Sequence, residues 1–461
     1  MRYHGDCVSD INIAYIGGGS REWAWGLMSD LALEGQLSGS IRLYDIDHEA
    51  AYANEIIGNR ILNDKNTKGE WHYKAVSTLE QALLGADFVF ISILPGTFEE
   101  MKSDVHTPEK YGIYQSVGDS AGPGGLIRAL RAIPMFVEIA EAIKMYAPEA
   151  WVINYTNPMT LCTGTLYEVF PQIRAFGCCH EVFAAQELLV KMLKDMNGLE
   201  GLHREDIRVN VLGINHFTWI DKATCDGMDL IPLFGKFADK YYESGFECPG
   251  TDDPEFYFES GKRVQFDLFR RYGTMSASGD RHAAEFCPPW YLKDPNTVAE
   301  WKFSLTPVSY RIKDRLEKIE KGKRLVSGAE SIVLKPSGEE GVLQVKALLG
   351  LGDLFTNVNL PNRGQIKGLP EGSVVETNAV FSKNSVTPVF AGKMPERVDS
   401  LVLRQVYNQK TILEAGLRKD KDLAFAAFAN DPLVTLSIRD AEKLFGEMLR
   451  NTKAYLDGWE L

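Results

Sequence analysis

The sequence lacks the features that would place the protein in a membrane, outside the cell or on nucleic acid. No apolar run reaches the length that spans a bilayer, and residues 1–10 contain no apolar signal core. The seven cysteines are an odd number in a chain of 461 residues, so a disulfide framework is not expected. The formal net charge of −13 argues against nucleic acid and anionic membranes as partners, because both are themselves anionic. We therefore expect a cytoplasmic protein with free thiols and with neither a nucleic-acid nor a membrane partner.

The most informative stretch is residues 11–20, an apolar run that ends in three consecutive glycines and a serine. An amphipathic segment follows at 23–33, so the pattern predicts a strand, a tight turn and a helix. In a dinucleotide-binding fold, such a turn lets the backbone approach a pyrophosphate, which binds at the helix N-terminus. Gly17 and Gly19 fit these roles, whereas Glu22 occupies the third glycine position of the fingerprint. The candidate cofactor-binding residues here are Gly17, Gly18, Gly19 and Ser20.

A second predicted strand, at residues 40–47, ends in carboxylates. A dinucleotide-binding fold places at this point the acidic residue that accepts hydrogen bonds from the adenosine ribose. We assign that role to Asp45 rather than to Asp47. The alternative is a simple glycine turn followed by a solvated acid. The order of strand, turn, helix and acidic strand end favours the nucleotide site.

Strands and helices alternate up to about residue 230, and the later chain becomes aromatic and charged. The predicted fold class is α/β, with a Rossmann-type doubly wound parallel sheet in residues 9–200 that binds a dinucleotide. We expect residues 201–461 to form a second, mainly α-helical α+β lobe. Later elements are expected as strands at 341–349, 354–360 and 373–381 and as helices at 397–418 and 436–456.

Polar side chains follow four strand or loop ends, at 154–157, 179–180, 215–216 and 279–285. A cysteine after an apolar strand is most often a buried small hydrophobe, and a histidine at a strand end is usually structural. Cys179 and His216 nevertheless offer a thiolate and an imidazole downstream of one dinucleotide fold. Such a pair makes a partial site for a divalent transition metal, with coordination positions left open for substrate oxygens.

Six motifs occur in order along nearly the whole chain: 17–20 (GGGS), 118–125 (GDSAGPGG), 154–158 (NYTNP), 179–180 (CH), 213–219 (GINHFTW) and 360–364 (LPNRG). Together they resemble the family 4 glycoside hydrolases. Residues 14–20 and 27–31 are most similar to the α-galacturonidase branch of that family. The resemblance implies a lactate/malate dehydrogenase-like fold with NAD⁺ and a divalent metal, usually Mn²⁺, as cofactors. It also implies a small-molecule glycoside or an oligogalacturonide as substrate, and a homodimer or homotetramer as the assembly. Residues 9–200 would then bind NAD, and residues 201–461 would serve catalysis, substrate binding and oligomerisation.

The resemblance further implies a redox-neutral mechanism. NAD⁺ takes a hydride from C3 of the sugar, the resulting ketone acidifies the C2 proton, and the metal stabilises the enolate as the C1 oxygen departs. Water then adds to the enone, and the hydride returns. Carried over by position, Cys179 and His216 hold the metal together with the 2- and 3-oxygens of the sugar.

A base for the C2 proton is expected in the region after the metal histidine, where Asp280 lies. His282 and Tyr257 are the alternatives, and His180 is a further candidate for a catalytic role. The other interpretation of Asp280 is an exposed acid paired with an arginine, which would contribute little to stability. Arg281 and Arg271 are the possible partners in that case.

His180 follows the metal cysteine, where family members that act on 6-phosphosugars carry Asp or Asn, and this difference favours an unphosphorylated sugar. A uronic acid would present a C6 carboxylate, which pairs with a bidentate arginine or with a lysine. Arg281, Arg271 and Arg263 lie in the right region, and the sequence does not choose among them. The substrate-binding candidates are Asn154, Asn157, Asn215 and Arg281, with strand capping as the other role for the first two.

The leading expectation is therefore hydrolysis of α-glycosides of an unphosphorylated sugar, above all α-galacturonides. An α-galactosidase, an α-glucosidase or an α-glucuronidase would use the same mechanism. A malate- or lactate-type dehydrogenase shares the nucleotide fold, but it needs no thiolate-bound metal and would change NADH absorbance in proportion to product. A non-enzymatic sugar sensor would need neither the metal cysteine nor the metal histidine.

Overall fold

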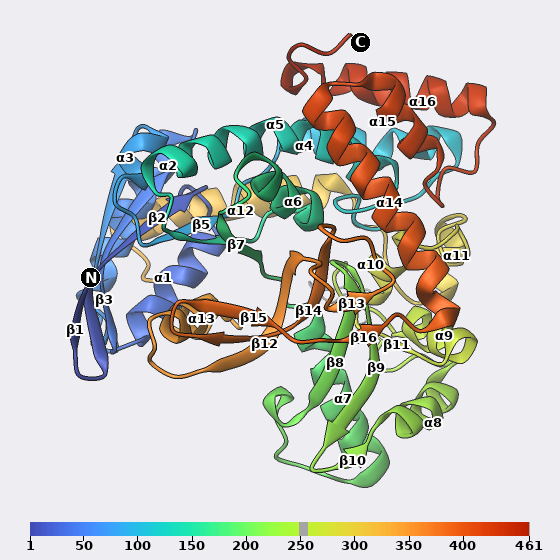
Figure 1. Ribbon diagram of the computed structural model, residues 1–461, viewed down its shortest axis with the longest axis horizontal. Coiled ribbons are helices and arrows are strands. Elements are labelled where there is room, and N and C mark those ends of the chain that lie inside the picture. Colours follow the sequence, from blue (N-terminus) through green and yellow to red (C-terminus); the bar gives the residue numbers. More distant parts are fainter. Residues whose placement is uncertain (249–256, 461) are drawn as a thin grey trace.

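The computed structural model describes residues 1–248 and 257–460 of the chain. Its central layer is a 10-stranded sheet with the order β15-β14-β12-β7-β6-β5-β2-β3-β4 and with β1 paired to β2 (Figure 1). The strands from the first half of the chain are β1 (Arg2–His4), β2 (Cys7–Ile16), β3 (Leu37–Tyr44), β4 (Trp71–Val76), β5 (Phe88–Ile91), β6 (Trp151–Asn154) and β7 (Arg174–Gly177). Strands β2 to β7 pair in parallel with one another.

The order β4-β3-β2-β5-β6-β7 is that of a doubly wound dinucleotide-binding fold, which confirms the predicted fold class. β5 shows why an apolar run folds in this way. Phe88 and Phe90 pack into the core on one face of the sheet, and Val89 and Ile91 pack into the core on the other. The strand order reverses between β2 and β5, so their carboxyl ends border the crevice where such sheets bind ligands.

Helices cover both faces of this sheet (Figure 1). α3 (Leu79–Leu83), α5 (Gly122–Tyr146) and α6 (Met159–Val169) contribute side chains to the core that contains Val89. α1 (Trp23–Leu33), α2 (His48–Ile61) and α13 (Gly341–Leu348) contribute to the core that contains Phe88. The other elements before residue 207 are α4 (Phe98–His106), η1 (Pro108–Tyr111), α7 (Glu181–Asn197) and η2 (Arg204–Asp206).

The second half of the chain completes the same sheet. β12 (Leu354–Pro361), β14 (Val374–Ser382) and β15 (Ser385–Pro388) are antiparallel, and β12 joins the edge of β7. The prediction of strands near 354–360 and 373–381 is therefore confirmed. The prediction of a strand at 341–349 was wrong, because these residues form α13. Their apolar side chains at 342, 345 and 348 recur at helical spacing and are buried on one side of the helix.

A smaller four-stranded sheet lies beyond α7, built from β8 (Arg208–Ile214), β9 (Phe217–Cys225), β10 (Met228–Asp229) and β11 (Met275–Ser276). A two-stranded sheet pairs β13 (Ile366–Lys367) with β16 (Gly392–Lys393). The remaining helices are α8 (Ile231–Tyr241), α9 (Arg263–Tyr272), α10 (Asp280–Glu285), α11 (Pro295–Glu300), α12 (Val308–Ser327), α14 (Glu396–Arg418), α15 (Lys421–Ala429), α16 (Ile438–Asn451) and η3 (Lys453–Tyr455).

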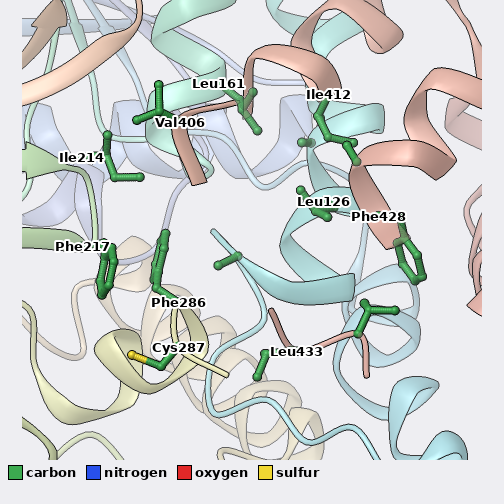
Figure 2. Close-up of a cluster of buried hydrophobic side chains, with 14 of the residues drawn as sticks. Leu126, Leu161, Ile214, Phe217, Phe286, Cys287, Val406, Ile412, Phe428 and Leu433 are labelled. Atoms are coloured by element: carbon green, nitrogen blue, oxygen red, sulfur yellow. The ribbon is translucent and has the colours of Figure 1, made fainter. Parts of the chain in front are cut away.

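One hydrophobic core joins the two halves of the chain (Figure 2). Leu126 of α5 and Leu161 of α6 share it with Ile214 of β8, Phe217 of β9 and Val406 of α14. The predicted parts 9–200 and 201–461 are thus connected through a common core as well as through the sheet. Among the described residues, no helix combines the length and the apolar character that crossing a membrane requires.

Candidate active site

The turn after β2 is held against the ends of the neighbouring strands. The N–H groups of Gly17 and Gly18 both donate to the carbonyl oxygen of Tyr44 at 2.9 Å, and the N–H of Ser20 donates to Gly17 at 3.0 Å. Gly17 has a φ of +92°, and a Cβ at this position would lie 2.0 Å from the carbonyl oxygen of Ser92, just after β5. Only glycine fits here, because any side chain would force the two strand ends apart.

Asp45 faces this turn from the end of β3. Its Oδ2 accepts the N–H of Gly19 at 2.9 Å, and its Oδ1 accepts the N–H of Asp47 at 2.9 Å. Burial raises the pKa of Asp45. Asp47 instead caps α2 by accepting the N–H of Ala50 at 3.0 Å. The structure therefore brings the predicted glycine turn and Asp45 together at the crevice and gives Asp47 a structural role.

Three potential metal ligands converge near the carboxyl edge of the sheet. One ligand atom from each of Asp119, His216 and His282 lies within 4.8 Å of the others. Asp119 comes from the glycine-rich loop before α5, His216 from the turn between β8 and β9, and His282 from α10. A carboxylate and two imidazoles form a donor set that suits a divalent transition metal.

His216 is held at the tip of a two-residue hairpin turn. Its φ is +62°, a left-handed conformation that is uncommon for residues other than glycine and that occurs often at functional sites. Its Nδ1 lies 2.8 Å from Ser120 Oγ, and that hydroxyl donates to Asp119 Oδ1 at 2.7 Å. Nδ1 therefore carries the proton, which leaves Nε2 with a free lone pair. Burial and the neighbouring His282 lower the pKa of His216 to about 4.

His282 stacks on His216, with ring centroids 3.8 Å apart and planes 15° apart. Its Nδ1 lies 2.6 Å from Glu181 Oε1, and an ionised carboxylate can only accept, so Nδ1 is the donor. Its Nε2 is buried with no hydrogen-bond partner among the described residues. Burial opposes ionisation of Glu181, but the charge of His282 outweighs it and lowers the Glu181 pKa to about 2. The result is an imidazole oriented by a carboxylate, with its other nitrogen unused.

Cys179 follows β7 and is buried beside this group rather than being one of its three members. Its thiol receives a hydrogen bond from the side chain of Asn215, the neighbour of His216 in the hairpin. Its carbonyl oxygen accepts the Nδ2 of Asn357 at 3.1 Å, and Asn357 also donates to Glu376 Oε1 at 2.6 Å. Burial raises the pKa of the Cys179 thiol, so binding of a cation would have to displace its proton.

Burial also raises the pKa of Glu376 to about 7. Glu376 and Asn357 lie side by side on β14 and β12 and fix the backbone of the cysteine. The candidate metal ligands therefore fit the donor chemistry of a divalent cation: a thiol, an imidazole with a free Nε2, and the Asp119 carboxylate.

The structure places Asp280 in a different environment from the histidine pair. Its Oδ1 accepts the N–H of Gln265 at 3.0 Å, in the first turn of α9, and the charge of Lys262 favours its ionised form. Burial raises the pKa of Asp280 to about 6. Its hydrogen bonds thus hold the start of α9. The predicted ion pair with an arginine is not formed among the described residues, and Arg271 pairs with Asp267 instead.

The predicted substrate-binding asparagines divide into two groups. The side chain of Asn154 is used within the protein, because it forms hydrogen bonds with the N–H and carbonyl of Thr156 and with the hydroxyl of Thr163. Asn157 instead donates its Nδ2 to Asp119 Oδ2 at 3.2 Å, and its Oδ1 is buried without a hydrogen-bond partner among the described residues. Asn157 therefore reaches the metal-ligand group, whereas Asn154 shapes the turn after β6 as a strand cap does.

A cavity of about 1140 Å³ opens beside this group. Its lining includes Trp23 of α1, Tyr155 after β6, His180, Phe258 and Arg311 of α12. Its volume is sufficient for an oligosaccharide-sized ligand. His180 faces it with Nδ1 at 2.8 Å from Glu339 Oε1, a hydrogen bond that raises the pKa of His180. The ring of Tyr257 packs at a tilt of 49° against the ring of Tyr310, with centroids 4.8 Å apart.

Sequence reasoning assigned no role to several of the carboxylates at this site. Asp119 lies inside the loop predicted to bind a ligand, but that prediction depended on the glycines around it. Glu181 directly follows Cys179-His180, so its position was a usable signal. Glu285 accepts the N–H groups of Val117 at 2.6 Å and Gly118 at 3.0 Å, and it thereby fixes the loop that carries Asp119. Burial raises the pKa of Glu285 to about 7.

Comparison with known proteins identifies the family. The model described as family 4 glycosyl hydrolase matches residues 12–195, and the model of its C-terminal domain matches residues 211–434. An α-galacturonidase from Thermoanaerobacterium saccharolyticum is 63% identical over 463 residues, which cover 100% of both chains. The crystal structure of lplD from Bacillus subtilis has a TM-score of 0.91 and 55% identity, covering 96% of this chain and 100% of that one.

A 6-phospho-α-glucosidase from gut microorganisms, solved in complex with NAD and Mn²⁺, has a TM-score of 0.80 at 19% identity, covering 97% of this chain and 99% of that one. At this level of identity, the similarity shows a shared fold. The two family models together span most of the chain. The chain belongs to the family 4 glycosyl hydrolases.

Proposed function

We propose that the protein is an α-galacturonidase that depends on NAD and a divalent metal such as Mn²⁺. Family membership and the 63% identity to an α-galacturonidase over the full length support the reaction and the substrate. The observation that carries the mechanism is the convergence of Asp119, His216 and His282 beside Cys179, at the carboxyl edge of a dinucleotide-binding sheet. Membership of a hydrolase family weighs against a malate- or lactate-type dehydrogenase.

The nucleotide and the metal each have a place in this arrangement. The turn at 17–20 and Asp45 would hold the nucleotide, and Cys179, His216 and Asp119 would hold the cation. When bound, NAD supplies a reversible hydride acceptor for C3 of the sugar, and the cation polarises the sugar oxygens. Asn157 and Asn215 border the cation site and are suited to orient the sugar hydroxyls. These roles are proposals that rest on position and donor chemistry.

We assign the removal of the C2 proton to His282. Its Nε2 is the buried, unpartnered nitrogen, and Glu181 fixes the ring from the other side. Of the alternatives, Asp280 is bonded to α9 through Oδ1, and the ring of Tyr257 packs at a tilt against that of Tyr310. His180, which lines the cavity and is paired with Glu339, is placed to exchange a proton with the departing oxygen. A His282→Gln variant that still binds Mn²⁺ but is inactive would separate the base role from a ligand role.

The assignment is tested with a panel of 4-nitrophenyl α-glycosides. We expect turnover of the galacturonide only when NAD, Mn²⁺ and a thiol reductant are present, with no net change in NADH absorbance. Fast turnover of the neutral galactoside or glucoside, or of the glucuronide, with none of the galacturonide would reject the substrate. A stoichiometric absorbance change would reject the redox-neutral mechanism. A cytoplasmic location and a homodimer or homotetramer are further proposals, which fractionation and sedimentation would check.

A further inference from the structure

Two arginines from different helices lie over one aromatic ring at the cavity. The guanidinium carbons of Arg281 (α10) and Arg311 (α12) are 5.4 Å and 5.6 Å from the ring centroid of Phe258. Phe258 and Arg311 line the cavity together with His180. Arg281 directly precedes His282 in the chain, so this cationic pair borders the residues assigned to the chemistry.

Among residues 1–248 and 257–460, neither guanidinium forms an ion pair. Within the described part of the chain, no Asp or Glu oxygen lies within ion-pair distance of Arg281 or Arg311, whereas Arg263 pairs with Glu243 and Arg271 with Asp267. The charge of Arg311 disfavours the charged form of Arg281, and Glu285, Asp119 and Glu181 oppose this effect without forming an ion pair with Arg281. Burial lowers the pKa of Arg281 to about 10, and the charge of Arg311 acts in the same direction.

Arg281 also has hydrogen-bonding capacity that the protein leaves unused. Its Nη2 donates to the carbonyl oxygen of Ser116 at 3.0 Å and to the hydroxyl of Thr306. These bonds fix the guanidinium, which is only 9% exposed. Its Nε is buried with no hydrogen-bond partner among the described residues. A rigid, desolvated guanidinium with an unused N–H, near a second guanidinium, is suited to bind a planar anion.

We propose that Arg281 and Arg311 together bind the C6 carboxylate of the uronic acid and thereby determine the specificity of the enzyme. This inference rests on the proposed function and deepens it. A carboxylate is the one charged group of an unphosphorylated uronide, and it would neutralise the paired guanidinium charges. A neutral galactoside would leave both charges without an anion, so discrimination comes from the cost of that unpaired charge. A sugar 6-phosphate has a related charge, and the experiment distinguishes the two.

The test uses the complete enzyme with NAD and Mn²⁺ and two matched variants of α12. Arg311→Gln removes one guanidinium, whereas Arg315→Gln removes an exposed arginine of the same helix that lies over Phe98. For Arg311→Gln we expect the ratio of kcat/KM for 4-nitrophenyl α-galacturonide to that for the α-galactoside to fall about 10- to 100-fold, mainly through KM. Arg315→Gln should keep the wild-type ratio. Calorimetric titration with galacturonic acid should show the same loss of affinity without relying on turnover.

Each outcome has a distinct meaning. An unchanged ratio and unchanged galacturonic acid affinity in Arg311→Gln would overturn the carboxylate site while leaving the α-galacturonidase assignment intact. A wild-type enzyme that cleaves galactoside 6-phosphate faster than galacturonide would overturn the assignment of a carboxylate to this pair. A wild-type enzyme that cleaves only the neutral galactoside would instead reject the proposed function. The second check is an Arg281→Lys variant, which keeps the positive charge but loses the planar guanidinium. Its ratio of kcat/KM for the galacturonide to that for the galactoside should be intermediate.

Discussion

Replacing Glu181 by Gln tests whether this carboxylate positions the base. Glu181 Oε1 lies 2.6 Å from His282 Nδ1, and the two side chains are 15% and 17% exposed. A partly buried hydrogen bond to a charged group contributes about 1.5–3 kcal/mol. The imidazolium formed when His282 takes a proton would lose this stabilisation, so the barrier to C2 deprotonation should rise by the same amount. We expect kcat to fall about 10- to 150-fold.

The kinetic isotope effect distinguishes positioning from a loss of structure. With a substrate deuterated at C2, the isotope effect on kcat should be larger in Glu181→Gln than in wild type, because the C2 step becomes more rate-limiting. KM for the substrate and the Kd for NAD should change little. Glu187→Gln is the matched control, since Glu187 is an exposed residue of the same helix.

The variant also loses the hydrogen bond from the Gly279 N–H to Glu181 Oε2, which is 3.2 Å long, so Tm is measured in parallel. A variant with a lower Tm but an unchanged isotope effect would show that Glu181 acts only through stability. Wild-type kcat in Glu181→Gln would refute the reasoning about the base altogether.

Three further predictions concern the turn, a buried acid and the thiol. Gly17→Ala should abolish NAD binding in calorimetry, because its Cβ would meet Ser92. It should also destabilise the fold by more than 2 kcal/mol, which is roughly the upper cost of a left-handed alanine alone. The control Gly198→Ala, with φ +68° and open space around it, should cost only about 1 kcal/mol of stability. Burial raises the pKa of Asp431 from 3.8 to about 6, so its contribution to stability is highest below pH 4 and is lost as pH rises to 6. In urea unfolding, the stability advantage of wild type over Asp431→Asn should therefore shrink by about 3 kcal/mol between pH 4 and 7, and a constant difference would contradict it. Cys179→Ser should abolish turnover while NAD binding and Tm stay near wild type, and wild-type activity would remove the metal assignment.

The parts of the fold that follow from local pattern were predictable. The apolar run around β5 and the glycine turn after β2 are recognisable in the sequence. A strand buried on both faces and a tight turn each allow only a few residue types. α13 was misassigned because an eight-residue segment carries too few turns to separate helical from strand periodicity. The joining of β12 to β7 is a long-range pairing that no local pattern encodes.

The candidate site could be predicted from the sequence by residue type, whereas the role of each residue stays a prediction. Cys179, His216 and His282 were singled out because each lies at a strand end or in a recognisable motif. Asp280 was ranked above His282, since sequence offset cannot show that the acid is bonded to α9 while the imidazole stacks on His216. Glu376 was not predicted as a site residue, because an acidic residue in a strand usually faces solvent. In the structure, β14 is covered on both faces.

The most direct test of the account is to remove both cofactors and restore them separately. Protein treated with a chelator and freed of nucleotide should lose cleavage of 4-nitrophenyl α-galacturonide, and neither Mn²⁺ nor NAD⁺ alone should restore it. Addition of both should return the full rate without accumulation of NADH. Cleavage at the full rate by the stripped protein would contradict a mechanism that proceeds through oxidation at C3 and loss of the C2 proton.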